Sequence, residues 1–234
     1  PCDVIVNTDG GNYEIWMVAP GGSVYEIKLK SVEPVNSSEK IIEALYKVKT
    51  RLNEFARRRK EEMHNNKWFG GTDMEKGAYR IMEFKVGDAG SNLDTGKLGF
   101  VFYTDKDKEA IEKELQEIEA DLRTEFEKAG IETEGFVPTT RFFHYMEADE
   151  NDPAITLMRD LASDAIGYPV KMAGAALSDL SLFLKYGSKS SFNIGIAGDF
   201  GRYGGAHQPD EYVELHELLA YTKTLARFIV KWCT

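Results

Sequence analysis

Residues 24–55, VYEIKLKSVEPVNSSEKIIEALYKVKTRLNEF, change their hydrophobic period part-way along. At the start, VYEIKLK alternates apolar and charged side chains, as a half-exposed strand does. Further on, apolar residues recur every three or four positions and predict an amphipathic helix that runs to about Met63. Asn36 and Glu39 have the spacing of a capping box, which places the start of this helix. The apolar positions are Ile41, Ile42, Leu45, Val48, Leu52 and Phe55.

The sequence that follows continues this strand and helix into a complete small domain. Its predicted elements are strands at 79–87 and 97–105, a helix at 106–129 that ends at Gly130, and a strand at 134–146. The resulting order, strand, helix, strand, strand, helix, strand, is that of a ferredoxin-like domain with both helices on one face of a four-stranded antiparallel sheet. We therefore predict such an α+β domain over residues 23–146.

The two flanks predict a second, α/β domain. The apolar run CDVIV reads as a strand buried in the middle of a covered sheet. After residue 147 we expect a helix at 154–166, a helix from about Ser178, the strand FNIGIAG at 192–198 and a last helix from Glu214. This alternation of strands and helices favours a parallel sheet shared by residues 1–22 and 147–234, with the ferredoxin-like domain inserted between them.

The charge and the composition of the chain limit the kinds of partner that we expect it to bind. The chain has 39 acidic and 29 basic residues, and its longest basic run is RRRK at 57–60, so nucleic acid is not an expected partner. Cys2 and Cys233 lie at opposite ends of the chain without the paired spacing of a zinc site, which favours a reducing, cytoplasmic setting. Since no apolar run reaches the length of a membrane span, we expect a soluble protein and no membrane partner.

Two polar residues follow predicted strands of the α/β domain. Asp9 comes just after the first strand, and His207 comes in the glycine-rich loop after the strand at 192–198. Ligands bind beyond the carboxyl ends of strands in such sheets, and carboxylate with imidazole is a common zinc donor pair. The alternatives are an Asx-turn for Asp9 and a hydrogen-bonded turn residue for His207. No G-x-S-x-G elbow surrounds any serine, which disfavours a serine hydrolase.

Each of several nearby residues can be interpreted either as part of a binding site or as a structural residue. Glu211 could hold a metal ligand in place or cap the last helix, and Asp179 with Ser178 has the plain reading of a helix N-cap. The segment FGRYGG could gather backbone N–H groups of Gly204 and Gly205 beside Arg202, which would hold a substrate carboxylate. The alternative for this segment is a flexible surface loop.

These pieces together resemble the co-catalytic zinc metallohydrolases, the family of aminoacylase, carboxypeptidase G, peptidase T and acetylornithine deacetylase. The last third has the family's order of pieces, AGAALSD, FNIGIAG, FGRYGGAH and PDEYVEL, and the opening VIVNTDGG is similar to the peptidase T form of a metal site. GSNLDTGKLGF at 90–100 is similar to the family's asparagine-containing turn before the third strand of its lid domain, with Asn92 at the matching position.

The resemblance implies a site with two zinc ions, or other divalent metals, and a glutamate as general base. Asp9 would bind one ion and His207 the other, with Asp179 and Glu211 supporting them and Asn92, Arg202, Gly204 and Gly205 contacting substrate. The ferredoxin-like domain would be a lid that forms a homo-oligomer. However, the family's His-x-Asp motif and Glu-Glu pair lie upstream of the strand that contains Asp9, in a part that this chain does not include. The histidine at the start of the first lid helix is also absent.

Two hypotheses follow from this pattern. In the first, the chain is the carboxyl-terminal portion of a zinc-dependent hydrolase that cleaves an amide bond in a small peptide or N-acyl amino acid. Such a chain would be active only with its amino-terminal half, and the start at Pro1, directly before a strand, favours this view. In the second, it is a non-catalytic binding or assembly subunit that has kept the fold and the dimer surface.

Overall fold

The computed structural model describes residues 2–33, 35–87, 93–196, 198 and 204–234. These residues divide into two compact units. The contiguous unit is Gly21–Tyr145, and the split unit combines Pro1–Pro20 with Met146–Thr234. Asn92 and Arg202, which we predicted to contact substrate, lie outside the described residues.

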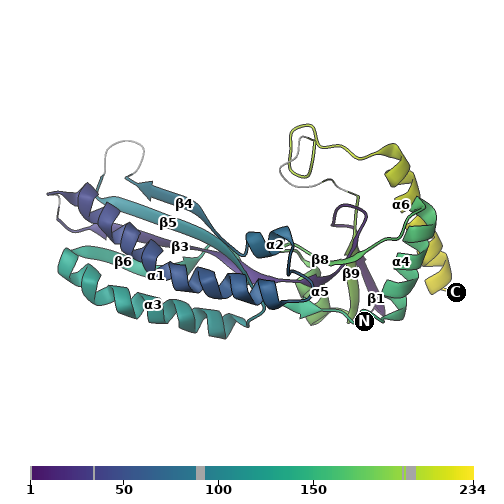
Figure 1. Ribbon diagram of the computed structural model, residues 1–234, viewed down its shortest axis with the longest axis horizontal. Coiled ribbons are helices and arrows are strands. Elements are labelled where there is room, and N and C mark those ends of the chain that lie inside the picture. Colours follow the sequence, from purple (N-terminus) through teal and green to yellow (C-terminus); the bar gives the residue numbers. More distant parts are fainter. Residues whose placement is uncertain (1, 34, 88–92, 197, 199–203) are drawn as a thin grey trace. The chain divides into compact units, whose positions relative to one another are not determined.

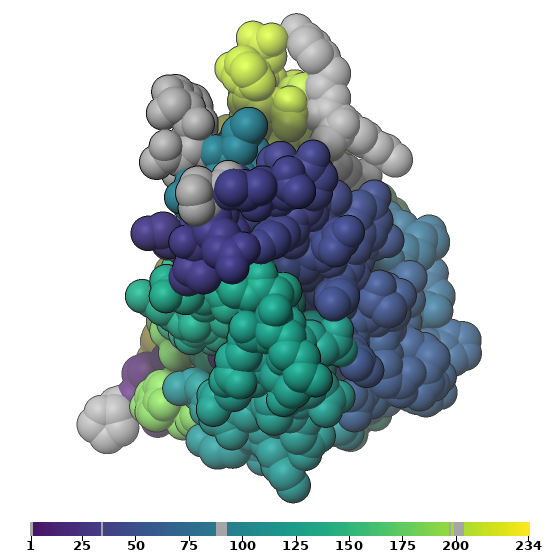
Figure 2. Space-filling model, turned by 90° about the vertical axis from the view of Figure 1, so that its left-hand side faces the viewer, coloured from purple at the N-terminus to yellow at the C-terminus, as the bar shows by residue number. Residues whose placement is uncertain are grey.

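The contiguous unit has one antiparallel sheet of order β4-β5-β3-β6. Figure 1 shows the two long helices, α1 and α3, on one face of this sheet. In the end view of Figure 2, α1 (blue) and α3 (teal) lie next to each other. The predicted ferredoxin-like order is therefore present, with a short added helix, α2. The elements are β3 Gly21–Ser31, α1 Ser37–Asn65, α2 Asp73–Lys76, β4 Tyr79–Val86, β5 Thr95–Thr104, α3 Lys108–Ala129 and β6 Ile131–Pro138.

The core of this unit follows from the two periods seen in the sequence. Alternate residues of β3 and β5 face the helices, and each helix buries a stripe spaced by three or four residues. Of the apolar positions predicted for α1, only Ile42 is exposed. The core contains Tyr25, Ile27, Leu29, Leu98, Phe100 and Phe102 from the strands, and Ile41, Leu45, Val48, Leu52, Phe55, Ile111, Leu115, Ile118, Leu122 and Phe126 from the helices.

The predicted capping box at the start of α1 is wrong. Asn36 has a left-handed φ of 53° and its side chain makes no bond to the helix. The carboxylate of Glu39 instead accepts a hydrogen bond from the Ser38 hydroxyl, 3.2 Å away, so it is drawn to a side chain and not back to the Asn36 N–H. At the end of α3 the prediction is confirmed, because Gly130 has a φ of 66° and closes the helix.

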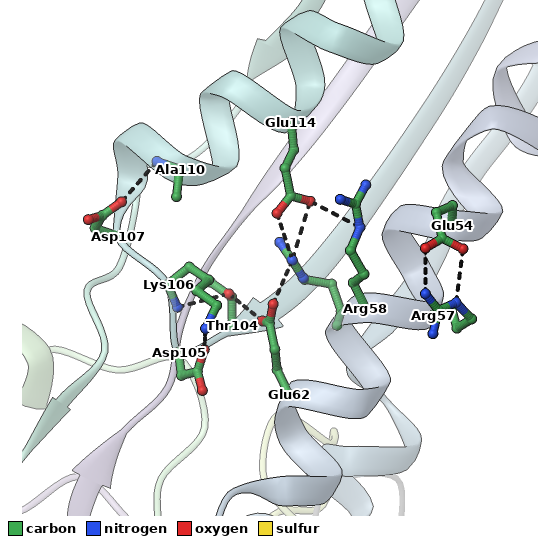
Figure 3. A network of polar contacts seen from close by, with 11 residues as sticks. Glu54, Arg57, Arg58, Glu62, Thr104, Asp105, Lys106, Asp107, Ala110 and Glu114 are labelled. Carbon is green, nitrogen blue, oxygen red and sulfur yellow. Dashed lines mark hydrogen bonds and ion pairs between the residues drawn. The ribbon is translucent and has the colours of Figure 1, made fainter.

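The arginines of the basic run at 57–60 are held by glutamates within the contiguous unit (Figure 3). Arg57 pairs with Glu54 along α1, as Figure 3 shows, and also with Glu61 one turn further on. Arg58 Nε lies 3.6 Å from a carboxylate oxygen of Glu114 on α3. The positive charge of this run is therefore largely compensated by acidic side chains of the same unit.

Arg59 is buried, and its side chain is 0% exposed. Its Nη2 donates to Glu62 at 2.7 Å and to Glu114 at 3.1 Å, and its guanidinium lies 4.6 Å from the centre of the Phe55 ring. The Thr104 hydroxyl donates to the second oxygen of Glu62 at 2.7 Å. Burial raises the pKa of Glu62, while Arg59 and Thr104 act in the opposite direction. The cluster ties α1 to α3 and to the end of β5.

The split unit is built on a mixed sheet of order β1-β9-β2-β7, in which β8 also pairs with β2. The parallel pairs are β1 with β9 and β2 with β8, whereas β2 runs antiparallel to β9 and β7. We predicted a parallel sheet, but the turn after β1 is too short for a parallel crossover, so β2 returns in the opposite direction. The elements are β1 Val4–Asn7, β2 Ile15–Ala19, β7 Met146–Glu147, α4 Pro153–Ile166, β8 Met172–Gly174, α5 Leu180–Tyr186, β9 Ser190–Ile194 and α6 Leu215–Trp232.

Helices cover both faces of this sheet. Phe228 of α6 packs edge-to-face on Phe192 of β9, with ring centres 6.2 Å apart, and α4 packs against α6. The end of α5 contacts the other face, where Gly187 lies against Ile5. The first strand was expected in the buried middle of the sheet. Within the described residues β1 pairs only with β9, at the end of the strand order, and its four residues are half-buried.

Candidate functional site

The turn between β1 and β2, which contains Asp9, has an unusual backbone. Gly10 has a φ of 153°, and Asn12 and Tyr13 have φ values of 60° and 53°. Positive φ is uncommon for residues other than glycine and costs about 1–3 kcal/mol each, so the surrounding structure must hold this turn in place. Asp9 itself is exposed.

Tyr13 anchors the turn to the last helix. Its side chain is 1% exposed, and its hydroxyl lies 3.0 Å from Thr224 Oγ1 of α6. Thr224 donates its own proton to the carbonyl of Ala220, so the Tyr13 hydroxyl is the donor to Thr224. The Tyr13 ring meets Tyr221 edge-on, with centres 6.4 Å apart. Burial raises the pKa of both phenols, that of Tyr221 to about 12, so both stay neutral donors at physiological pH.

The turn also packs closely on the residues that follow β9. The N–H of Tyr13 donates to the Gly195 carbonyl at 3.1 Å. A Cβ added to Gly195 would lie 2.4 Å from the Gly10 carbonyl oxygen, so only glycine fits there. Within the two strands themselves, the side-chain amide of Asn7 donates to the side-chain oxygen of Asn193 at 3.1 Å. Because β1 and β9 are parallel, their carboxyl ends share one edge of the sheet, and Asp9 follows directly from that edge.

His207 lies in the segment between β9 and α6, within the same split unit. It is exposed and has a φ of 62°, and its backbone N–H donates to the Glu211 carboxylate at 3.3 Å. Glu211 therefore contacts the backbone of His207, while the N-cap position of α6 is Glu214. Gly204 is buried beneath the ring of Tyr212, whose N–H donates to the Gly204 carbonyl at 3.1 Å. Gly205 is buried beside it.

Asp179 is exposed and occupies the N-cap position of α5, but its side chain does not bond to the helix. Its backbone carbonyl accepts from Leu182 and Phe183 instead. The buried hydroxyl of Ser178 has no hydrogen-bond partner within the described residues. Asp179 therefore occupies the predicted N-cap position, but the side-chain hydrogen bond expected of an N-cap residue is not formed.

Asp9 and His207 have the donor chemistry of zinc ligands. Among the described residues, however, no group of three or more histidine, cysteine, aspartate or glutamate side chains is placed to hold a metal ion. Since a protein zinc site ordinarily takes three or four protein ligands, the donors described in this chain do not complete one.

Sequence reasoning missed the residues that shape this edge. Tyr13 and Tyr221 read as ordinary aromatic positions, and the close approach of Gly10 to Gly195 joins segments that are distant in the chain. The available signal was a glycine soon after each of two strands, Gly10 after β1 and Gly195 directly after β9, since such glycines often mark close backbone approach.

Replacing Tyr13 with phenylalanine is expected to lower the free energy of unfolding by about 1 kcal/mol, because that is the usual net contribution of one hydrogen bond to stability. Thermal unfolding checks this value. Tyr168→Phe is the matched control, because Tyr168 is 47% exposed and should tolerate loss of its hydroxyl. Equal effects of the two substitutions would mean that the Tyr13–Thr224 bond does not stabilise the turn.

The sequence matches the family model for peptidase family M20/M25/M40 over residues 5–231. The chain belongs to this family. Solved structures share its fold at low sequence identity. A tripeptidase from Staphylococcus aureus has a TM-score of 0.67 at 14% identity, with 98% of this chain and 57% of that chain covered. Human carnosine dipeptidase 1 has a TM-score of 0.62 at 14% identity, covering 98% and 60%.

The aminopeptidase PepT from Bacillus cereus is also similar, with a TM-score of 0.60 at 15% identity over 97% of this chain and 55% of that chain. A structure from Sulfolobus solfataricus with the same fold is described as an M20 metallo-carboxypeptidase. No curated protein matches the sequence. The chain spans less than two thirds of the length of these solved relatives. Its mixed α/β class matches that of the M20 peptidase fold.

Proposed function

We propose that this chain is the carboxyl-terminal portion of a zinc-dependent M20 hydrolase that cleaves an amide bond in a small peptide or N-acyl amino acid. The family match over residues 5–231 carries the proposal. The relatives named tripeptidase, dipeptidase and aminopeptidase support a peptide substrate. The chain spans 57% of the tripeptidase, which supports a requirement for a further portion to complete the site.

In this proposal Asp9 and His207 each supply one ligand to a two-metal site. Bound zinc would polarise the scissile carbonyl and activate a water molecule. The remaining ligands and the general base would come from the amino-terminal portion. The anchored turn after β1 would fix the position of Asp9, and Glu211 would restrain the backbone of His207. Arg202, Gly204, Gly205 and Asn92 would contact the substrate, and Asp179 would play a supporting role.

The setting of this enzyme is also proposed. The two cysteines are free and exposed, which supports a reducing, cytoplasmic location. None of the helices formed by the described residues is long and apolar enough to cross a membrane. We propose that two or more copies associate through the contiguous unit.

Asp9→Ala and His207→Ala test the proposed ligands. In the chain combined with its amino-terminal portion and zinc, each substitution is expected to lower turnover of di- and tripeptides by at least about 100-fold. Loss of a residue that merely supports a ligand already costs 10- to 100-fold. Bound zinc, measured by elemental analysis of the purified complex, should fall in parallel. Asp3→Ala and His216→Ala are matched controls, since both side chains are exposed and neither is a proposed ligand.

The second candidate is a non-catalytic binding or assembly subunit. The lack of a three-donor group among the described residues favours it. Such a subunit would keep its association and stability in both alanine variants, and the combined chains would hydrolyse none of the peptides or N-acyl amino acids. Native mass spectrometry that finds this chain without a complementary M20 portion would also favour this candidate.

A further inference from the structure

The turn that carries Asp9 crosses β9. In the sheet β9 lies between β1 and β2, so the chain that connects these two strands has to pass over β9. The crossing is close at Gly10, where an added Cβ would lie 3.2 Å from the nitrogen of Gly195 and 3.7 Å from the Cβ of Asn193. Asn193 is therefore the side chain of β9 that lies against this turn.

The amide group of Asn193 is only half satisfied. Asn193 is 0% exposed, and its side-chain oxygen accepts the hydrogen bond from Asn7. Its nitrogen, Nδ2, has no hydrogen-bond partner among the residues that the structure describes. Because Asn7 and Asn193 are in register on neighbouring strands, the bond between them fixes which way the Asn193 amide is turned.

The missing partner of Asn193 is a hydrogen-bond acceptor, because Nδ2 can only donate. A buried N–H without an acceptor is destabilising, and in a native protein such a group calls for an explanation, such as a role in catalysis or a bound water molecule. Ser191 lies two residues earlier on the same side of β9 and is also buried, but its hydroxyl donates to the Ser188 carbonyl at 2.6 Å. Burial on this side of β9 therefore does not by itself leave a polar group unpaired.

Asp9 has the acceptor that Asn193 lacks. It is the single carboxylate of residues 8–13, and it directly precedes Gly10, whose Cα is about 3.8 Å from its own. Asp9 is exposed, and within the described part of the chain its carboxylate accepts no hydrogen bond. A carboxylate has two oxygens, so one can accept from an amide while the other binds a metal ion, and the charge strengthens the hydrogen bond.

We propose that Asn193 is a positioning residue for Asp9. In the complete enzyme its Nδ2 donates to one carboxylate oxygen of Asp9 and leaves the other oxygen to the metal, while Asn7 holds the Asn193 amide in the orientation that this requires. This inference rests on the proposed function. Carboxylates that bind a metal ion are themselves hydrogen-bonded, and loss of such a partner ordinarily costs 10- to 100-fold in metal affinity or activity.

Asn193→Ala and Asn193→Asp test the donor. In the chain combined with its amino-terminal portion, each is expected to weaken zinc binding by about 10- to 100-fold, measured by competition with a chelator. The aspartate variant keeps an oxygen but loses the N–H and adds a like charge beside Asp9. Peptide turnover should show a lower kcat with little change in KM, because Asn193 is buried away from the substrate.

Ser191→Ala is the matched control for these variants. It removes a buried polar group from the same side of the same strand, so it should leave zinc affinity unchanged even where it lowers thermal stability. Unchanged zinc affinity in either Asn193 variant would overturn the inference. An equal loss of affinity in Ser191→Ala would also overturn it, because the effect would then come from general destabilisation of β9.

Nuclear magnetic resonance tests the bond with Asn193 in place. In the combined enzyme, with asparagine of this chain labelled with ¹⁵N, the Asn193 side-chain amide protons are expected to shift downfield and to exchange more slowly when zinc is added. The change should be absent in Asp9→Ala and present in Asp3→Ala, both of which replace an exposed side chain. The same change in Asp9→Ala would overturn the inference, since another acceptor would then take the N–H.

The two proposals can fail separately. Zinc binding that depends on Asn193 without hydrolysis of any tested substrate would refute the proposed function and leave the positioning role standing. Zinc binding and hydrolysis that both survive Asn193→Ala unchanged would refute the positioning role and leave the function standing.

Discussion

Replacing Arg59 with alanine is expected to lower the free energy of unfolding of the contiguous unit by about 3 to 5 kcal/mol. The guanidinium is fully buried and is the shared partner of Glu62 and Glu114. Its removal leaves the largely buried Glu62 without its arginine partner and Glu114 with Arg58 alone, and it opens a cavity beside Phe55. Urea unfolding followed by circular dichroism, with hydrogen exchange of the β5 amides, measures the loss.

Arg57→Ala is the matched control on the same helix. Arg57 pairs with Glu54 and Glu61 at the surface, where its side chain is 56% exposed, so its loss should change stability little. Replacing Arg59 by methionine together with Glu62→Gln and Glu114→Gln should recover most of the stability, because no buried charge is then left unpaired. If Arg59→Ala behaves like Arg57→Ala, the buried cluster does not stabilise the unit.

Gly195→Ala is expected to destabilise the split unit by about 1 to 3 kcal/mol, the usual cost of forcing extra atoms into a packed site. The new Cβ would lie 2.4 Å from the Gly10 carbonyl oxygen, so one of the two turns must move. One of these turns carries Asp9, so under the proposed function the variant should also lose peptide turnover when it is combined with the amino-terminal portion and zinc. Thermal unfolding and peptide hydrolysis measure the two effects.

Gly198→Ala is the control for this prediction. It lies in the segment after the same strand, and its added Cβ would meet Gly205 at 3.6 Å, an ordinary contact. Stability and turnover should therefore stay near those of the parent chain. If Gly195→Ala is equally silent, the close approach of the two turns does not position Asp9.

The fold could be predicted because its signals are local. Alternation in β3 and the three-to-four spacing in α1 and α3 each reflect which face of one element is buried, and both appear in the sequence directly. The errors arose where the outcome depended on distant partners. The antiparallel pairing of β2 with β9 joins segments far apart in the sequence, and the half-burial of β1 reflects its place at the end of the strand order.

The candidate site was less predictable for the same reason. Asp9 and His207 were predicted as metal ligands from their positions after strands. The backbone of the Asp9 turn, by contrast, depends on a bond between Tyr13 and Thr224, which are 211 residues apart in the chain. No local sequence pattern predicts the left-handed φ of Asn12 and Tyr13, since neither residue is a glycine. Only the assembled sheet and helix show why that conformation is held.

The pairing of β1 with β9 has a consequence for the order of folding. Asn7 and Asn193 are separated by 186 residues, so the sheet that positions Asp9 cannot close until nearly the whole chain has been synthesised. The contiguous unit needs only residues 21–145 and can fold while the rest is still being made. During that interval β9, the strand with which β1 pairs, has not yet been made.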